Sequence, residues 1–513
     1  MKTNRVIKIF LASSEELEAD RYRFGNLIRK LDNIYEKRGI RIELFEWEDY
    51  DAAYNGMRKQ DEYNERVRAS DMFLALFHKK AGKFTIEEFN IARKAFDEQA
   101  SPKIYTYIKD LEAGESESRE LAEFKRLMLE ELGHYWCRYS NFDTMQLHFV
   151  LQLQMVEATT PIKVEVKESQ VKIGDSTIAD LNNVPFTSEN ATHRELQSRK
   201  EQLDREIGNA ESGGRRGFFG QRSRMTDEEL ANLREERESV TEQIERQEKA
   251  LVDTAMSIAR MQGGECSPRM RTAAELFEKG EIDKAEAVLK EDDMEADATN
   301  AKLKFDTAAQ PTAELTRNIE RCAGEYMLKA RIVVSGIADE SRYRQAVKLM
   351  STAIDLVSGR LPEETLAEYL FDYAVLLTDT GQQTKALETW ERLSGIYERL
   401  YRKAPQKYAY GYAGVLNNMA VLYSDKGDFD HCLSKYLKAI DIYDWLDREE
   451  PGIYDDDIAR LKNNLGTLYS DRDEYNKALS EFNEAARIRF ELLAKDNDPD
   501  SRSALADIYC NMA

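Results

Sequence analysis

The sequence predicts an open, parallel α/β domain followed by an all-α region. Three observations predict this. Apolar strand segments alternate with helical segments from residue 1 to about 160, two helix-start signals lie between 191 and 263, and a spacing of 46 residues recurs between 264 and 513. Alternating strands and helices are typical of a parallel sheet, and a fixed period is typical of a helical repeat array. We therefore expect an α/β domain at 1–160, a small β extension at 161–190, a helical hairpin at 191–263 and a repeat array at 264–513.

The charge balance argues against two classes of partner. The chain has 513 residues, with 96 acidic and 74 basic side chains, and a formal net charge of -22. Such a chain repels phosphate backbones and anionic lipids, so we do not expect nucleic acid or a membrane surface as a partner. No segment approaches the roughly 20 apolar residues that a membrane span needs. Lys8 interrupts the apolar N-terminus, which predicts a buried first strand rather than a signal peptide.

The cysteines and histidines are few and scattered. Five cysteines lie far apart, which fits a reducing compartment in which thiols are small core residues. The five histidines show no zinc-like spacing, so we expect no metal site. The sequence therefore predicts a cytoplasmic protein.

Five apolar segments predict the strands of the sheet: Val6–Leu11, Arg41–Phe45, Met72–Phe77, Lys103–Ile108 and Tyr135–Tyr139. Crossover helices between them imply a parallel sheet, and in such sheets ligands bind outside the carboxyl ends of the strands. No glycine-rich phosphate loop follows any of these strands, which argues against a dinucleotide-binding Rossmann fold or a P-loop.

Several segments in the first 155 residues resemble one family. The segments 9–14 and 70–77 are similar to the first and third strands of Toll/interleukin-1 receptor (TIR) domains, and 82–92 is similar to the stretch that carries the catalytic glutamate in bacterial members. Glu88 and Ala92 match that stretch. The Trp-Cys-x-x-Glu motif of animal members is absent, although Trp47-Glu48-Asp49 and Gln60 resemble bacterial TIR-like members.

This resemblance implies a flavodoxin-like sheet and a function. Many bacterial TIR domains hydrolyse NAD in antiviral or stress responses, often as oligomers, whereas others only act as scaffolds. It implies Glu88 as the catalytic residue, NAD as a substrate rather than a cofactor, and a homo-oligomer formed through the TIR-like domain.

A physical argument for Glu88 stands beside the resemblance. Breaking the nicotinamide–ribose bond builds positive charge on the ribose, and an adjacent carboxylate can stabilise it without a metal. The alternative is structural, because Thr85-x-x-Glu88 also matches a capping box. A helical projection places Glu88 at the border of the buried face and Glu87 towards water. The residues that define that face are Ile86, Phe89, Ala92 and Phe96.

Candidates for substrate binding follow the predicted strands. They are Ser13, Trp47, Glu48, Lys80 and Thr85. Three of them have a structural alternative of their own: Ser13 can cap the next helix, Trp47 can pack in the core, and Lys80 can simply be solvated. His78 as a general base, or Lys79 as a diphosphate contact, rests on position alone.

Residues 161–263 predict a connector. Val164 and Val166, then Val171 and Ile173, alternate with polar residues, which indicates a small hairpin. Thr192-x-x-Glu195 and Thr226-x-x-Glu229 match the capping box, so we expect a helix to start at each. Apolar residues at heptad spacing from 230 to 261 predict that the two helices pair antiparallel. The tip, 213–224, carries Phe218, Phe219 and four arginines and is either a simple loop or a contact point.

The repeat array follows. Small residues recur 46 apart in two series, Ala374, Ala420, Gly466 and Ala386, Cys432, Ala478. This resembles a long tetratricopeptide pattern, in which small residues let paired helices approach closely. The resemblance implies a groove for a protein or peptide partner. The last four residues repeat the pattern of 417–420, so we expect that the natural chain continues or that this end docks against another surface.

These observations lead to one hypothesis and two alternatives. We expect an NAD glycohydrolase that is activated by oligomerisation or by a partner bound to the array, in bacterial antiviral defence. The first alternative is a non-enzymatic TIR adaptor, and the second is a glycosidase acting on another nucleotide.

Overall fold

The computed structural model describes residues 5–36, 39–45, 59–112, 114–131, 136–156, 164–173, 176–211, 226–261, 266–336, 339–449, 451–496 and 499–512. The chain forms two compact units. The sheet unit comprises 1–154, 163–264 and 278–280, and the array unit comprises 155–162, 265–277 and 281–513. In the described part of the chain, no helix is long and apolar enough to cross a membrane.

The sheet unit is built on five parallel strands in the order β2-β1-β3-β4-β5. The strands are β1 (Arg5–Ser13), β2 (Ile40–Phe45), β3 (Met72–Phe77), β4 (Lys103–Lys109) and β5 (Trp136–Tyr139). The predicted strands and their parallel pairing are confirmed, including the first strand at the N-terminus. All six residues of the central strand β3 are buried, as expected for a strand covered on both faces.

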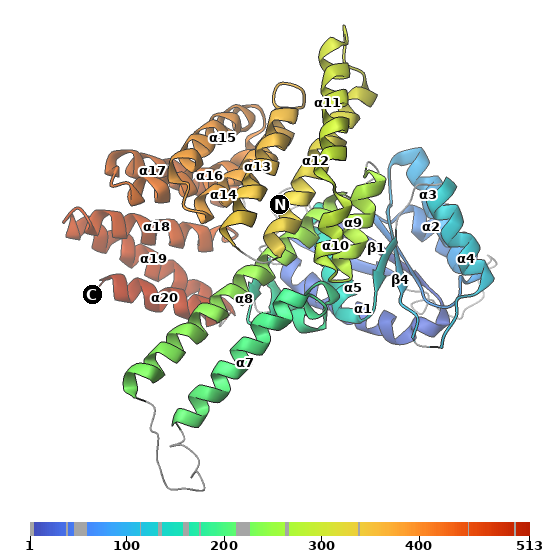
Figure 1. Cartoon of the computed structure of the whole chain (residues 1–513), viewed down its shortest axis with the longest axis horizontal. Helices are drawn as coiled ribbons and strands as arrows, with labels where there is room; N and C mark the ends of the chain where they lie inside the picture. Colours follow the sequence, from blue (N-terminus) through green and yellow to red (C-terminus); the bar gives the residue numbers. More distant parts are fainter. Residues whose placement is uncertain are drawn as a thin grey trace. The chain divides into compact units, whose positions relative to one another are not determined.

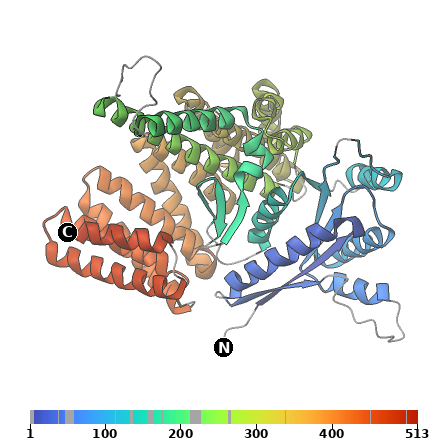
Figure 2. The same cartoon turned by 90° about the horizontal axis from the view of Figure 1, so that it is seen from below.

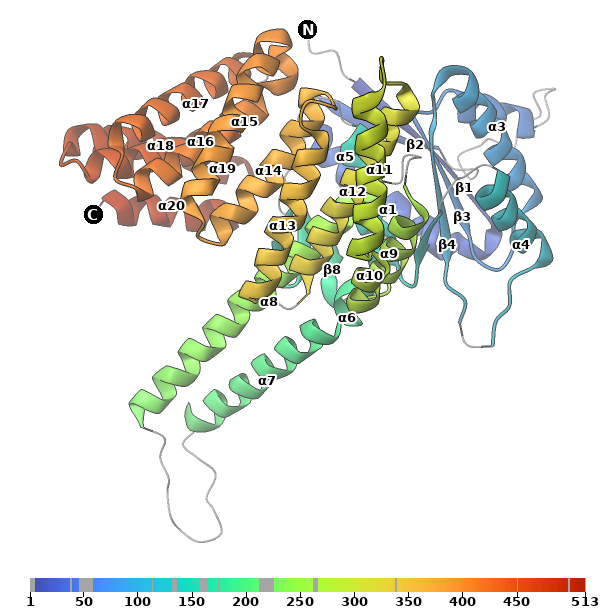
Figure 3. The same cartoon turned by 45° about the horizontal axis from the view of Figure 1, so that its top comes forward.

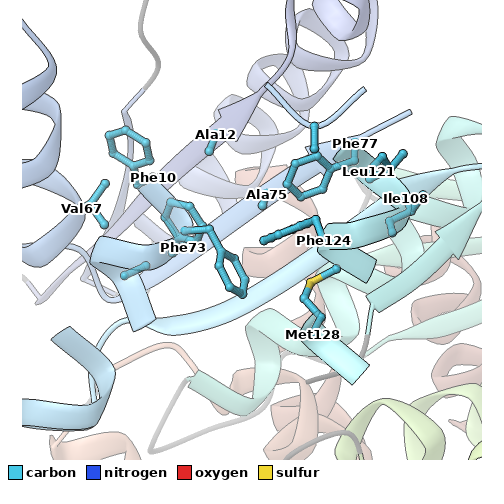
Figure 4. Close-up of a cluster of buried hydrophobic side chains, with 13 residues drawn as sticks. Phe10, Ala12, Val67, Phe73, Ala75, Phe77, Ile108, Leu121, Phe124 and Met128 are labelled. Carbon is cyan, nitrogen blue, oxygen red and sulfur yellow. The ribbon is translucent and has the colours of Figure 1, made fainter. Parts of the chain in front are cut away.

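Four helices connect the strands, and a fifth follows the last strand: α1 (Glu18–Glu36, after a 3-10 turn at Glu15–Leu17), α2 (Lys59–Arg68), α3 (Lys83–Gln99), α4 (Arg119–Arg126, continued as a π-helical turn at Leu127–Glu131) and α5 (Phe142–Val156). Phe10, Phe73 and Phe77 project from one face of the sheet into a core with α2, α3 and α4 (Figure 4). Residues that alternate with these face the other way, where Phe24 of α1 contacts Phe149 of α5, with ring centroids 4.7 Å apart. Figure 2 shows α1, in dark blue, running alongside β1.

A second, antiparallel sheet follows. It consists of β6 (Glu165–Lys167), β7 (Gln170–Ile173) and β8 (Ser176–Asp180). The predicted hairpin is therefore present, and the structure adds a third strand that the alternation did not indicate. A 3-10 turn (Leu181–Asn183) and the short helix α6 (Pro185–Ser188) lead out of this sheet.

Two long helices, α7 (Ala191–Glu211) and α8 (Asp227–Met261), form the predicted antiparallel hairpin (Figure 3). Leu203 packs against Val240 and Ile244 in its seam. The capping box at the start of α8 is confirmed: the Thr226 amide donates to the Glu229 carboxylate at 2.7 Å, and the Glu229 amide donates to the Thr226 hydroxyl at 3.1 Å. The predicted tip, 213–224, lies outside the described residues.

The predicted capping box at Thr192 is wrong. The Asn190 side chain accepts from the amides of Thr192 and His193, so Asn190 caps α7 and Thr192 lies inside it. The sequence pattern missed this because Asn190 has the same capping chemistry two residues earlier, and nothing local decides between the two.

The array unit is helical, and paired antiparallel helices follow one another as in a repeat array of the tetratricopeptide type (Figure 1). Its helices are α9 (Pro268–Glu278), α10 (Ile282–Val288), α11 (Glu291–Thr307), α12 (Ala313–Ser335), α13 (Glu340–Val357), α14 (Glu363–Asp379), α15 (Gln383–Lys403), α16 (Pro405–Asp425), α17 (Phe429–Glu449), α18 (Asp455–Ser470), α19 (Tyr475–Asp496) and α20 (Pro499–Met512). The last residue of α9 is assigned to the sheet unit.

The recurring small residues lie at the contacts within each helix pair. Ala374 and Ala420 are fully buried, and an added Cβ at Gly466 would lie 2.6 Å from the Phe482 ring. A third series shares the period of 46 residues: Trp390, Tyr436 and Phe482 are all buried. In the pair of α18 and α19, the small residue on the first helix therefore faces the large ring on the second, which supports the predicted close approach there.

The expectation that cysteines are small core residues holds only in part. Cys137, Cys322 and Cys432 are buried, but Cys266 is half-buried and Cys510 is exposed.

Two glycines of the array provide a matched test of the close approach between paired helices. Gly466→Ala should destabilise the array by about 1–3 kcal/mol, because the new methyl group overpacks the buried Phe482 ring. Gly414→Ala in α16 meets no atom within 4 Å and should stabilise it by about 0.5–1 kcal/mol through helix propensity. Urea unfolding of the two variants measures both changes, and an equal gain from both substitutions would refute the close approach.

Candidate functional site

The strand order reverses between β1 and β3. From β1 the chain crosses to β2 on one side, and from β3 it crosses to β4 on the other. In open α/β sheets the ligand binds in the crevice at such a reversal, outside the carboxyl ends of the strands. Ser13 ends β1 opposite Leu76 of β3, so the segments that follow Ser13 and Phe77 border this crevice.

Glu16 bridges the two segments. Its carboxylate oxygen Oε1 accepts from the backbone amides of Lys79 and Lys80, at 2.9 Å and 3.1 Å. The Ser14 hydroxyl donates to the same oxygen at 3.3 Å. Two consecutive amides that point at one anionic oxygen form a small anion-binding concavity. Here the chain's own carboxylate occupies it.

Ser13 does not cap the following helix. Its hydroxyl oxygen accepts a hydrogen bond from Arg21 Nη1 at 2.9 Å, and the same nitrogen donates to the Ser14 carbonyl at 2.9 Å. Arg21 is only 2% exposed. A buried guanidinium therefore fixes the end of β1, and Ser13 remains at the crevice as predicted.

A buried carboxylate ties the other strand ends to α1. Asp20 Oδ2 accepts from Lys109 Nζ at 2.9 Å and from the Tyr139 hydroxyl at 3.0 Å. Burial, together with the Asp20 charge, raises the pKa of Tyr139, so the phenol stays protonated and donates. Asp20 thus joins the ends of β4 and β5, a role that the sequence did not indicate.

Lys79 and His78 both lie beside the Glu115 carboxylate at this edge. Lys79 Nζ lies 2.5 Å from Glu115, and His78 Nε2 lies 3.3 Å from the same carboxylate. The hydrogen bond from Lys79 lowers the pKa of Glu115. Lys80 is exposed, which leaves its ammonium group accessible to a ligand.

The capping-box interpretation of Thr85 and Glu88 is wrong. Gly82 is the N-cap of α3, with extended backbone angles and no side-chain cap, and Thr85 lies inside the helix. The Ile86 amide donates to the Gly82 carbonyl at 3.0 Å. Glu88 is therefore in the second turn and cannot close a capping box with Thr85. The helix starts earlier than the sequence suggested because glycine also serves as an N-cap.

The buried face of α3 also differs from the prediction. Phe89 and Ala92 are buried as expected, but Phe96 is 45% exposed and Glu88 is only 7% exposed. The buried polar residues Thr85 and Glu88 shift this face, and a count of apolar residues could not detect them. Glu88 therefore belongs to the buried face rather than to its border.

Glu87 does not simply point to water. It is half-buried, and its Oε1 accepts from Asn64 Nδ2 of α2 at 3.3 Å. The prediction was wrong because α2 packs beside α3 and covers the side of the helix on which Glu87 lies. Trp47 and Glu48, the remaining predicted substrate contacts, lie outside the described residues.

The array unit has a shallow surface depression at its inter-helix turns. It is lined by Lys426, Gly427, Asp428, Phe429, Asp430, Asp471 and Arg472. Arg472 lies 3.4 Å from the Asp430 carboxylate, which joins two successive repeats at this surface. The lining is polar and open, unlike an enclosed small-molecule pocket.

Comparisons with known proteins show only a general likeness. No family model and no curated protein match the chain. Among solved structures, BtubC from P. vanneervenii matches at 17% identity over 58% of this chain and 92% of its own, with a TM-score of 0.31. The apo form of RapI matches at 15% identity over 61% and 71%, with a TM-score of 0.34. A signal-transduction ATPase with a tetratricopeptide repeat sensor from Pyrococcus horikoshii matches at 11% over 98% and 90%, with a TM-score of 0.29. Scores this low say nothing about function.

Asp20 and Asp110 provide a matched test of the strand-end network. Asp20→Asn should destabilise the sheet unit by about 1.5–3 kcal/mol, because it removes a buried charge that holds Lys109 and Tyr139. Asp110→Asn breaks an exposed pair with Arg138 and should cost less than about 1 kcal/mol. Hydrogen exchange of the β4 and β5 amides measures both. Equal costs would mean that Asp20 does not organise this edge.

Proposed function

We propose that the sheet unit is a TIR-like NAD glycohydrolase whose catalytic carboxylate is Glu88, and that the array binds a protein or peptide that controls it. The observation that carries this proposal is the burial of Glu88 on α3, the helix that follows β3 at the carboxyl edge of the sheet. A carboxylate in this position has no role as a helix cap, since Gly82 begins the helix.

The proposed chemistry requires a negative charge beside the ribose. As the bond to nicotinamide breaks, positive charge develops at the ribose carbon, and the Glu88 carboxylate would stabilise it. A buried carboxylate is effective here because a low dielectric strengthens the attraction to the developing charge. Thr85 lies one helical turn before Glu88 and is also buried, so its hydroxyl is a candidate for orienting the carboxylate or a ribose hydroxyl.

Diphosphate binding is supported by the amides at the crevice. The Lys79 and Lys80 amides already hold an anionic oxygen of Glu16. A phosphate oxygen would take the place of the Glu16 carboxylate on these amides, which requires Glu16 to move away, and the exposed Lys80 ammonium and the Ser13 hydroxyl would add donors. Trp47 and Glu48 remain predicted substrate contacts from the TIR resemblance alone.

Glu88→Gln tests the proposal directly. The substitution keeps the size of the side chain and removes its charge, so we expect NAD cleavage to fall about 100-fold or more, at about 1.4 kcal/mol of barrier per tenfold. Release of nicotinamide, measured beside the melting temperature, separates catalysis from folding.

Glu87→Gln is the control on the same helix. Its amide oxygen can still accept from Asn64, so both cleavage and melting temperature should be unchanged. Full activity in Glu88→Gln, or an equal loss in Glu87→Gln, would reject Glu88 as the catalytic residue. A wild-type chain that cleaves another nucleotide but not NAD would instead favour the alternative glycosidase, and one that cleaves none would favour an adaptor.

A further inference from the structure

Three potential metal ligands that are distant in the sequence meet in the sheet unit. They are Cys137 of β5, His148 of α5 and Glu278, the last residue of α9, which is assigned to this unit. One ligand atom from each, a sulfur, a ring nitrogen and a carboxylate oxygen, lies within 4.8 Å of the other two. This is the one such group among the described residues.

The sheet places Cys137 on the same face as Tyr107, the hydrogen-bond partner of His148. Cys137 pairs with Tyr107 in the register of β4 and β5, and neighbouring residues across a sheet project from the same face. The Tyr107 hydroxyl lies 3.1 Å from His148 Nδ1, so the His148 ring, on α5, covers this face. The other ring nitrogen of His148, Nε2, is fully buried.

The backbone just after Glu278 packs closely against α6. Gly280, two residues later, has a φ of +77°, and an added Cβ there would lie 2.5 Å from the Pro185 carbonyl oxygen of α6. Only glycine fits so close to that carbonyl, so the turn at 279–280, directly after Glu278, is fixed against α6.

We propose that Cys137, His148 and Glu278 form a zinc site, with Tyr107 as the residue that orients His148. A thiolate, an imidazole and a carboxylate are the ligand types that Zn²⁺ takes in proteins, and three protein ligands leave a fourth position for water. Ligand atoms around tetrahedral zinc lie about 3.5 Å apart, so the side chains would move inward by about 1 Å at most. A ligating histidine usually donates its other ring N–H to a neighbouring group, which fixes the ring, and here the Tyr107 oxygen would accept from Nδ1.

The site is separate from the proposed NAD chemistry. Tyr107 and Cys137 project from the face of the sheet covered by α1 and α5, whereas α3, which carries Glu88, packs on the opposite face with Phe10 and Phe73. The proposed zinc would therefore join β5, α5 and the end of α9, away from the site proposed to cleave NAD.

Metal titration of the full chain tests this site. After treatment with a chelator, the protein should bind one Zn²⁺ per chain in competition with a chromogenic chelator, and Co²⁺ should give the absorption band of a cobalt–thiolate bond. Cys137→Ser should abolish the band, and His148→Gln or Glu278→Gln should weaken zinc binding at least about tenfold. Cys432→Ser removes another buried thiol and should leave both readouts unchanged.

Tyr107→Phe keeps the test valid even if the ligand variants fold poorly. It removes only one hydroxyl from a buried ring, and we expect zinc affinity to fall about 10- to 100-fold while the circular dichroism spectrum is retained. Absence of stoichiometric zinc in the wild type, a cobalt band that survives in Cys137→Ser, or unchanged affinity in Tyr107→Phe would each overturn the proposal.

Discussion

The parallel pairing of β1 with β3 puts the ends of two strands side by side, and the candidate site depends on it. The chain leaves these strands in opposite directions, which opens a gap between the segments that follow them. The protein closes it with side chains: Glu16 holds two amides after β3, and Arg21 holds Ser13 at the end of β1. A ligand that enters here would meet donors that already bind an anionic oxygen.

The positions of the strands and the period of the repeats could be predicted from the sequence, because each follows from a local pattern of residues. An apolar segment such as Met72–Phe77 has few alternatives to a buried strand, and a recurrence of 46 residues indicates one packing arrangement used repeatedly. The capping box at Thr226 and Glu229 was readable for the same reason, since both partners lie within one turn. In these cases the partner residues are close in the sequence or repeat at a fixed interval.

Features that depend on tertiary contacts could not be predicted from the sequence. Glu88 is buried because neighbouring elements cover its side of α3, and an amphipathic pattern counts only apolar residues. Asn190, rather than Thr192, caps α7. The sequence could not distinguish them, because either side chain can cap a helix. Cys137, His148 and Glu278 have no recognisable spacing, and only the register of β5 with β4 and the fixed turn at Gly280 bring them together.

Successive repeats of the array place different large side chains at the same buried position. Trp390, Tyr436 and Phe482 occupy equivalent buried positions, and the smallest opposing residue, Gly466, allows the Phe482 ring to approach closely. Such an array presents successive turns at one surface, where Arg472 reaches the preceding repeat at Asp430. Its ligand would be recognised by polar contacts spread over several repeats, which suits a folded protein or a peptide better than a small molecule.

The central proposal is that the sheet unit cleaves NAD, and the TIR resemblance adds the expectation that assembly controls the cleavage. The most direct measurement is nicotinamide release by the purified full chain over a wide range of protein concentration, with the oligomeric state recorded by light scattering at each point. The account predicts that release per molecule rises steeply as oligomers form. Absence of release at every concentration, including those at which the chain is assembled, would contradict it.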